Sequence, residues 1–209
     1  NLTELSLGLG FQKKTLVPVG GGKDAVVTLE LLKKAGVPLR PFLLNPKPEQ
    51  QKILGLAKVS KPIVVERTID PKLLELNHKG FLNGHTPFSA YLAFLSVLCG
   101  VLFGYKYIAL SNERSSNEGN VKYLRKIINH QYSKSFEFEK KFREYSKKYL
   151  VKDIEYFSFL RPLYELQIAK IYSKYPKYFS AFLSCNEANK TKSGVCSDMC
   201  TWMEKWCKR

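Results

Sequence analysis

The stretch that decides the fold is Thr15-Leu-Val-Pro-Val-Gly-Gly-Gly-Lys-Asp24. Its first five residues predict a short buried strand over residues 15–19. The glycines that follow allow the backbone to turn and to approach a ligand closely. A helix pattern comes next, with apolar Val26, Leu29 and Leu32. Because a helix N-terminus presents free N–H groups and the positive end of its dipole, this order of elements favours an anion site.

The candidate cofactor-binding residues of this turn are Gly20, Gly21, Gly22, Lys23 and Asp24. Lys23 adds a mobile positive charge, and Asp24 is a candidate ligand for Mg²⁺ bound to the phosphates. The spacing matches neither a Walker A loop nor a GxGxxG fingerprint. A glycine-rich turn without a ligand is the alternative interpretation.

Strand and helix patterns alternate through the first half of the chain. Further strands are predicted at residues 39–44, 62–66 and 106–110, and further helices at residues 49–59 and 88–103. Repeated β-α-β units with continuously apolar strands predict an α/β fold, with a parallel sheet covered by helices on both faces. The helix at 88–103 is apolar on nearly every side, so we expect other elements to enclose it. It is shorter than the roughly 18–20 residues of a membrane span.

The second half predicts a charged amphipathic helix at residues 133–150, a fifth strand at 154–160 and a helix at 162–172. No repeat or low-complexity linker marks a domain boundary. We predict a nucleotide-binding α/β region at residues 1–130. A helical, basic C-terminal extension at residues 131–209 is expected to pack on the same domain.

The 34 Lys and Arg residues outnumber the 18 Asp and Glu residues, for a formal net charge of +16. This excess favours an anionic partner, such as nucleic acid, nucleotide phosphates or a phosphorylated substrate. A lysine-rich solvated surface is the alternative. No RGG tract, RNP signature or helix-turn-helix pattern accompanies the charge, so specific nucleic-acid binding is the less favoured interpretation.

Ten polar residues follow the strand at 106–110: Ser111-Asn-Glu-Arg-Ser-Ser-Asn-Glu-Gly-Asn120. Ligands bind at the carboxyl ends of strands in open parallel sheets. Glu113 and Glu118 can bind a metal or move a proton, and Arg114 can pair with a substrate carboxylate. The other candidate substrate-binding residues are Ser111, Asn112, Asn117 and Asn120. A solvated surface loop is the alternative.

A third polar motif, Asn83-Gly-His-Thr-Pro87, precedes the apolar helix. Its histidine, His85, can donate to a phosphate or a carboxylate, and Thr86 can cap the helix. A capping turn with an incidental histidine is an equally plain interpretation.

Four segments, taken together and in order, resemble the UDP-N-acetyl-α-muramoyl-L-alanyl-L-glutamate epimerase family. They are residues 17–24, 83–87, 109–120 and 129–139. The first also resembles the pyrophosphate loop, Ser-Gly-Gly-x-Asp-Ser, of ATP pyrophosphatase-type enzymes. Gly20 and Ala25 stand at its two hydroxyl positions, so the side-chain donor at position 25 is absent.

The resemblance implies a bacterial, cytoplasmic isomerase. It would use ATP and Mg²⁺ to invert the terminal glutamate of UDP-MurNAc-L-Ala-L-Glu from L to D in peptidoglycan biosynthesis, releasing AMP and pyrophosphate. Adenylation of the glutamate carboxylate would remove its charge and make the α-proton easier to abstract. The candidates for moving that proton are Glu113, Glu118, His85 and His130, which the sequence does not rank.

The cysteines and the chain ends complete this interpretation. Cys185, Cys196, Cys200 and Cys207 can supply four zinc ligands, although no paired CxxC supports such a site. The chain begins well inside the span that the family leads us to expect and stops at the start of its Cys-rich end. We therefore expect a fragment or a shortened member of the family. The alternatives are an adenylating enzyme of the same fold that acts on tRNA, and a basic binding module that has lost catalysis.

Overall fold

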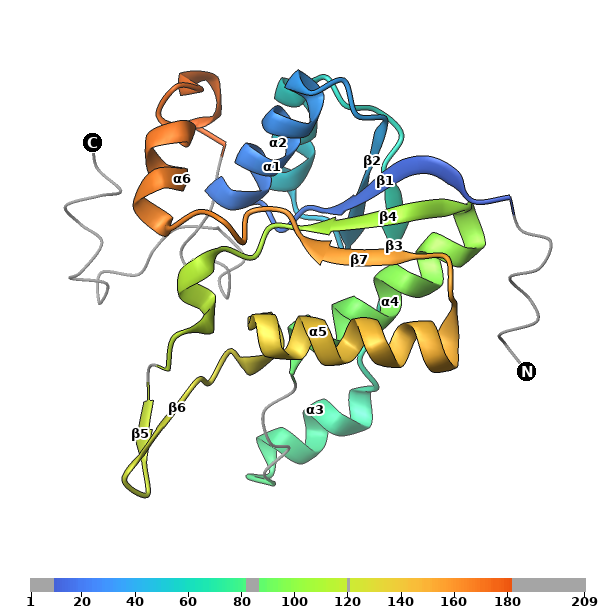
Figure 1. Ribbon diagram of the computed structural model, residues 1–209. Helices are drawn as coiled ribbons and strands as arrows, with labels where there is room; N and C mark the ends of the chain where they lie inside the picture. Colours follow the sequence, from blue (N-terminus) through green and yellow to red (C-terminus); the bar gives the residue numbers. More distant parts are fainter. Residues whose placement is uncertain (1–9, 82–86, 120, 182–209) are drawn as a thin grey trace.

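The computed structural model describes residues 10–81, 87–119 and 121–181. In chain order the elements are β1 (Gln12–Pro18), α1 (Lys23–Lys34), β2 (Leu39–Leu44), α2 (Pro48–Ala57), β3 (Ile63–Val65), α3 (Pro71–His78), α4 (Phe88–Phe103), β4 (Tyr105–Leu110), η2 (Arg114–Asn117), β5 (Val121–Tyr123), β6 (Lys126–Ile128), η3 (Tyr132–Lys134), α5 (Phe136–Tyr145), η4 (Ser146–Leu150), β7 (Glu155–Ser158), α6 (Glu165–Tyr172) and η5 (Pro176–Tyr178). The central sheet has the order β3-β2-β1-β4-β7, and all four pairings are parallel (Figure 1).

Consecutive residues of the central strands point to opposite faces of the sheet, as the pleat requires. Val17 of β1 and Ala109 of β4 lie in one buried cluster with residues of α1, α2 and α6. Their neighbours Leu16 and Ile108 lie in a second cluster with residues of α4 and α5. Figure 1 shows these two groups of helices on opposite sides of the sheet. The predicted parallel sheet with helices on both faces is therefore confirmed.

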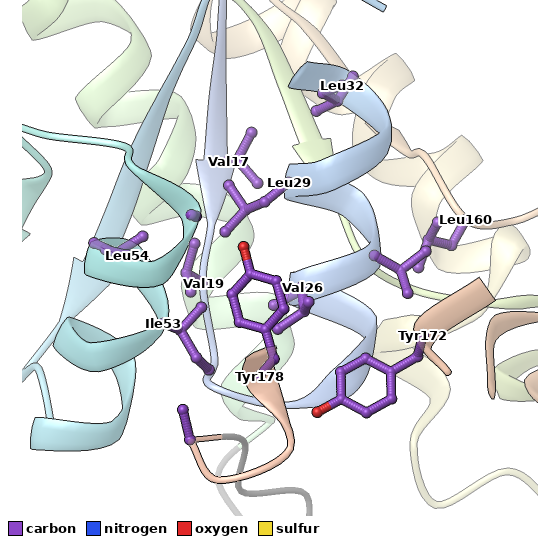
Figure 2. Close-up of a cluster of buried hydrophobic side chains, with 14 of the residues drawn as sticks. Val17, Val19, Val26, Leu29, Leu32, Ile53, Leu54, Leu160, Tyr172 and Tyr178 are labelled. Atoms are coloured by element: carbon purple, nitrogen blue, oxygen red, sulfur yellow. The ribbon is translucent and has the colours of Figure 1, made fainter. Parts of the chain in front are cut away.

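The first cluster is closed by Tyr178 of η5, which is fully buried. Figure 2 shows its ring between α1 and α2, near Val26, Leu29 and Ile53. This segment follows α6, so the C-terminal part of the described chain completes the core of the N-terminal part. The strand β7 does the same for the sheet. The stretches before and after residue 130 therefore share one sheet, and both contribute to the first buried cluster.

The Tyr178 hydroxyl donates a hydrogen bond to Oε1 of Glu30 in α1. Lys177 Nζ lies 2.9 Å from the same oxygen. Burial by itself raises the pKa of Glu30, but the hydrogen bonds from Tyr178 and Lys177 outweigh it, and the pKa is lowered. The folded protein thus favours the charged form of this carboxylate.

One expectation about α4 is wrong. Phe94, Leu98 and Leu102 are 45%, 53% and 67% exposed, so one side of this helix is not enclosed. Its other side, with Ala93 and Val97, packs against the sheet. Uniform apolarity along a helix cannot tell which side is covered, because it carries no periodic signal. Within the described residues, no helix is long and apolar enough to cross a membrane.

Several predicted boundaries also shift. The amphipathic helix begins after Ser135, whose hydroxyl caps α5 by accepting from Phe138 N, and its last turn widens into the π-helical η4. The last strand and helix are both shorter than predicted. The helix α3, which Asp70 caps, is absent from the predicted elements. So is the β5–β6 hairpin, whose turn residues Leu124 and Arg125 both have positive φ without the usual Asn-Gly signature.

Candidate active site

The loops that follow β1 and β4 lead to opposite faces of the sheet. The chain after β1 enters α1, which packs in the first cluster, and the chain after β4 leads to α5, in the second. In open α/β sheets such a reversal creates a crevice at the carboxyl edge, where ligands bind. Thr28 of α1 donates from Oγ1 to Ser111 Oγ at 2.9 Å. The start of the polar loop therefore lies beside α1, the helix that the glycine-rich loop begins.

The glycine-rich loop after β1 has a backbone that only glycine adopts readily. Gly21 has φ +91°, and a Cβ there would lie 3.2 Å from Gln50 Cγ. Gln50 belongs to α2 and donates from Nε2 to Val19 O at 3.0 Å. Gly22 is the N-cap of α1 and provides no side-chain cap. The helix N-terminus is therefore free of a competing side-chain acceptor, and α2 braces the loop from behind.

Lys23 is the central charge of the crevice. Its Nζ lies 3.1 Å from Asp24 Oδ1 and 3.2 Å from Glu165 Oε1 at the start of α6. Burial by itself lowers the pKa of Lys23, but the two carboxylates outweigh it, and the pKa is raised. The lysine is therefore charged, and its ammonium group links the start of α1 to the start of α6.

The folded protein favours the charged form of Lys23 but disfavours the charged form of Asp24. Burial raises its pKa, and this effect exceeds the lowering by Lys23; the negative charges of Glu113 and Glu165 add to the rise. A further cation beside this buried carboxylate would favour its charged form. Mg²⁺ usually binds through one or two carboxylates together with substrate phosphates. Asp24 remains the candidate carboxylate for that role. Among the described residues, no group of three or more His, Cys, Asp or Glu side chains can hold a metal ion.

The polar loop after β4, residues 111–119, is called the substrate loop below. Both oxygens of Glu113 accept from Ser115, with distances of 2.7 Å from its N and 2.7 Å from its Oγ. This carboxylate therefore caps the η2 turn. Glu118 ends the same turn and is exposed. The geometry thus separates the two predicted carboxylates into a capping residue and one that faces solvent.

The amides and the arginine of the substrate loop are also placed by contacts. Asn112 Nδ2 donates to Ser158 Oγ at 3.1 Å. Asn117 Oδ1 accepts from Phe136 N at 2.6 Å, so this side chain ties the loop to α5. The Arg114 guanidinium lies 4.8 Å from the centre of the Tyr164 ring, beside the start of α6. Of these three, Arg114 has the side chain best placed to meet a ligand.

The remaining candidates are less closely defined. His130 is exposed, and the segment that carries it is tied to the substrate loop by Asn129 Nδ2, which donates to Ser116 O at 2.7 Å. His85, Asn120 and the four candidate zinc cysteines lie outside the described residues. Cys99 is buried in α4, as core packing predicts.

Comparison with known proteins decides the family. Residues 6–159 match the family model described as "MurL N-terminal domain". The chain belongs to the MurL N-terminal domain family.

Curated relatives of this MurL N-terminal domain carry one name, UDP-N-acetyl-alpha-D-muramoyl-L-alanyl-L-glutamate epimerase. The relative from Xanthomonas oryzae pv. oryzae (strain MAFF 311018) is 37% identical over 180 residues, which cover 85% of this chain and 39% of the relative. That from Micromonospora sp. is 36% identical over 197 residues, or 93% and 42% of the two chains. That from Salinispora tropica is 35% identical over 196 residues, or 94% and 41%. The chain thus spans about two fifths of the length of these relatives.

One solved structure also resembles this chain. It is the predicted subunit of a tRNA methyltransferase from Methanocaldococcus jannaschii, at 18% identity and a TM-score of 0.46. The similarity covers 78% of this chain and 75% of that one.

The structure adds residues that the sequence of this MurL N-terminal domain did not single out. They are Thr28, Gln50, Arg161, Tyr164 and Glu165. Glu165 lies in the first turn of α6, where acidic residues are common, so its sequence position carries a capping signal and not a site signal. Their part in the site depends on how α2, α6 and the end of β7 come together, which no local pattern encodes.

Proposed function

We propose that this chain carries the adenylating site of a glutamate epimerase, which inverts the terminal L-Glu of UDP-MurNAc-L-Ala-L-Glu to D-Glu with consumption of ATP. One observation supports this most: three relatives at 35–37% identity bear that enzyme's name, and the family match covers both crevice loops. A peptidoglycan precursor of this kind is made in the cytoplasm, so we place the reaction there.

The glycine-rich loop is proposed to hold ATP. Its phosphates would lie at the N-terminus of α1, where the free N–H groups and the helix dipole favour negative charge. Lys23 would turn from Glu165 toward a phosphate, since both are anions. Mg²⁺, held by Asp24 and the phosphates, would supply positive charge for the leaving pyrophosphate. Gly20 is exposed, and Gly21 and Gly22 keep side chains out of this space.

The substrate loop is proposed to face the glutamate. The α-carboxylate of the substrate glutamate attacks the α-phosphorus of ATP, so that an acyl-adenylate forms and pyrophosphate leaves. The adenylate has lost the carboxylate charge, and a base then removes the α-proton to give an enolate. Return of a proton on the opposite face inverts the centre, and water releases AMP. Arg114 would bind the remaining side-chain carboxylate of the substrate, with Ser111, Asn112 and Asn117 shaping the loop.

Among the proton carriers, the geometry favours Glu118. Glu113 already accepts two hydrogen bonds from Ser115, which hold it in a capping position. Glu118 is exposed on the same loop. His130, on the tethered neighbouring segment, is the candidate for the opposite face.

Hydroxylamine trapping tests the proposal. The protein is incubated with ATP, Mg²⁺, hydroxylamine and UDP-MurNAc-L-Ala-L-Glu, and the products are identified by mass spectrometry. We expect a glutamyl hydroxamate and an equal amount of AMP. UDP-MurNAc-L-Ala, which lacks the glutamate, is the matched control and should give neither. AMP formation that ignores the glutamate, or no AMP with the intact substrate, contradicts an adenylating site for this substrate.

A further inference from the structure

Arg161 lies just beyond β7, and its guanidinium connects three segments of the crevice. Nη1 donates to Glu113 O at 2.9 Å and to Ser116 Oγ at 2.9 Å, both in the substrate loop. Nη2 donates to Lys134 O at 2.7 Å, in the segment that leads into α5. One planar group therefore joins the substrate loop to the neighbouring segment and to the end of the sheet.

The charge of Arg161 is balanced within the protein by Glu139 of α5. Nη2 lies 3.2 Å from Glu139 Oε2, and the two side chains are 14% and 6% exposed. Glu139 Oε1 accepts from Ser158 N at 3.2 Å. Ser158 Oγ accepts from Arg161 Nη2 and from Asn112 Nδ2, each at 3.1 Å. The network thus reaches the substrate loop at the backbone carbonyl of Glu113 and at the side chains of Asn112 and Ser116.

An ion pair at this depth does not by itself stabilise a fold more than apolar packing of the same volume. What it supplies here is a fixed set of donors for acceptors that come from separate segments. The substrate loop has no apolar side chain with which to anchor itself in the core. Its shape therefore depends on polar contacts, and Arg161 makes most of those that reach it from the segment after β7.

We propose that Arg161, held in place by Glu139, is a positioning residue that fixes the substrate loop in the shape that binds the glutamyl dipeptide. Arg161 acts through the loop and does not touch the substrate. The proposed function assigns ATP to the glycine-rich loop, and the hydrogen bonds of Arg161 go to other segments, so the affinity for ATP is expected to depend little on Arg161. This inference rests on the proposed function, because that function assigns residues 111–119 to the substrate.

The test compares Arg161→Met with Arg143→Met. Arg143 of α5 also pairs with a glutamate of β7, Glu155, at 3.4 Å, but its side chain is 40% exposed, and it serves as the matched control. Amide hydrogen exchange is measured at residues 111–119. Calorimetry measures the affinities for ATP with Mg²⁺ and for UDP-MurNAc-L-Ala-L-Glu.

In Arg161→Met, we expect exchange at the amides of Arg114, Ser115 and Glu118 to become faster. The affinity for the dipeptide substrate should fall roughly 10- to 100-fold, the range for losing hydrogen bonds to a charged group. The affinity for ATP should stay within about threefold. Arg143→Met should match the wild type in all three measurements.

Arg161→Lys covers the case in which the methionine variant does not fold. It keeps the charge beside Glu139 but lacks the planar fork that reaches several acceptors at once. It should therefore fold and still show a loosened loop and weaker substrate binding.

Three outcomes oppose the inference. If the wild type binds the substrate and both Arg161 variants bind it equally well, Arg161 has no positioning role. If ATP affinity falls in parallel with substrate affinity, Arg161 is a general structural residue. If the wild type itself does not bind the substrate, the proposed function fails, and the inference fails with it.

Discussion

The conformation of Gly21 allows a sharp test of the nucleotide site. In Gly21→Ala the new residue must adopt φ +91°, and its Cβ would lie 3.2 Å from Gln50 Cγ. Backbone strain of this kind costs about 1–3 kcal/mol. For a protein of this size, the melting temperature should fall by roughly 2–12 °C. Displacement of Gln50 also weakens its hydrogen bond to Val19 O, which braces the loop.

The same substitution should weaken ATP binding. A shifted loop misplaces N–H groups at the start of α1, and losing one hydrogen bond to a charged phosphate costs about 1.5–3 kcal/mol, or roughly 10- to 100-fold in affinity. Calorimetric titration with ATP and Mg²⁺ measures this loss, and scanning calorimetry measures the melting temperature.

Gly36→Ala is the matched control. Gly36 also has a positive φ, +67°, but it lies at the other end of α1 and has open space around its Cα. This variant should lose stability through the same backbone strain while keeping full ATP affinity. Equal ATP affinities in wild type, Gly21→Ala and Gly36→Ala would refute the assignment of the glycine-rich loop to the phosphates.

Three further predictions concern single groups. Asp24→Asn should abolish Mg²⁺-dependent ATP binding yet raise the melting temperature at neutral pH. The folded pKa of Asp24 is raised, so its negative charge lowers stability at pH values above its ordinary pKa. The gain in melting temperature should therefore vanish in acid. Tyr178→Phe should lower the free energy of unfolding by about 1.5–3 kcal/mol, measured with urea at neutral pH. The pKa of Glu30 is lowered, so the stabilisation is present above its ordinary value of 4.5 and is lost as the pH falls through the folded pKa, and the loss in Tyr178→Phe should shrink there. In heavy water, Glu118→Gln should still form the adenylate but no longer exchange the substrate α-hydrogen; wild-type exchange in this variant, with loss of exchange in Glu113→Gln instead, would reverse their roles.

Much of the sheet can be predicted from the sequence because its strands are buried on both faces. Such strands are continuously apolar, and the glycine-rich turn after residue 19 ends the first of them unambiguously. The polar run that begins at Ser111 marks the carboxyl end of β4 in the same way. Both loops were therefore predicted, and in the structure Thr28 of α1 donates a hydrogen bond to Ser111 at the start of the second.

The environment of each site residue could not be predicted. Glu113 and Glu118 are equivalent in sequence, and only the contacts of Glu113 with Ser115 distinguish them. Arg161 is one of many basic residues in the second half, and its burial depends on where Glu139 of α5 lies relative to the end of β7. The prediction that other elements enclose α4 failed for a related reason. Packing across the fold decides which side of an apolar helix is covered.

The central claim is that the crevice between β1 and β4 adenylates and inverts the glutamate of a muramoyl dipeptide. Chiral analysis of the glutamate tests it most directly. The protein is incubated with UDP-MurNAc-L-Ala-L-Glu, ATP and Mg²⁺, the product is hydrolysed, and the two enantiomers of glutamate are separated. We predict D-glutamate that appears only with ATP and is lost in Gly21→Ala but not in Gly36→Ala. Glutamate that stays entirely L, in wild-type protein shown to bind both ATP and the dipeptide, would contradict the claim.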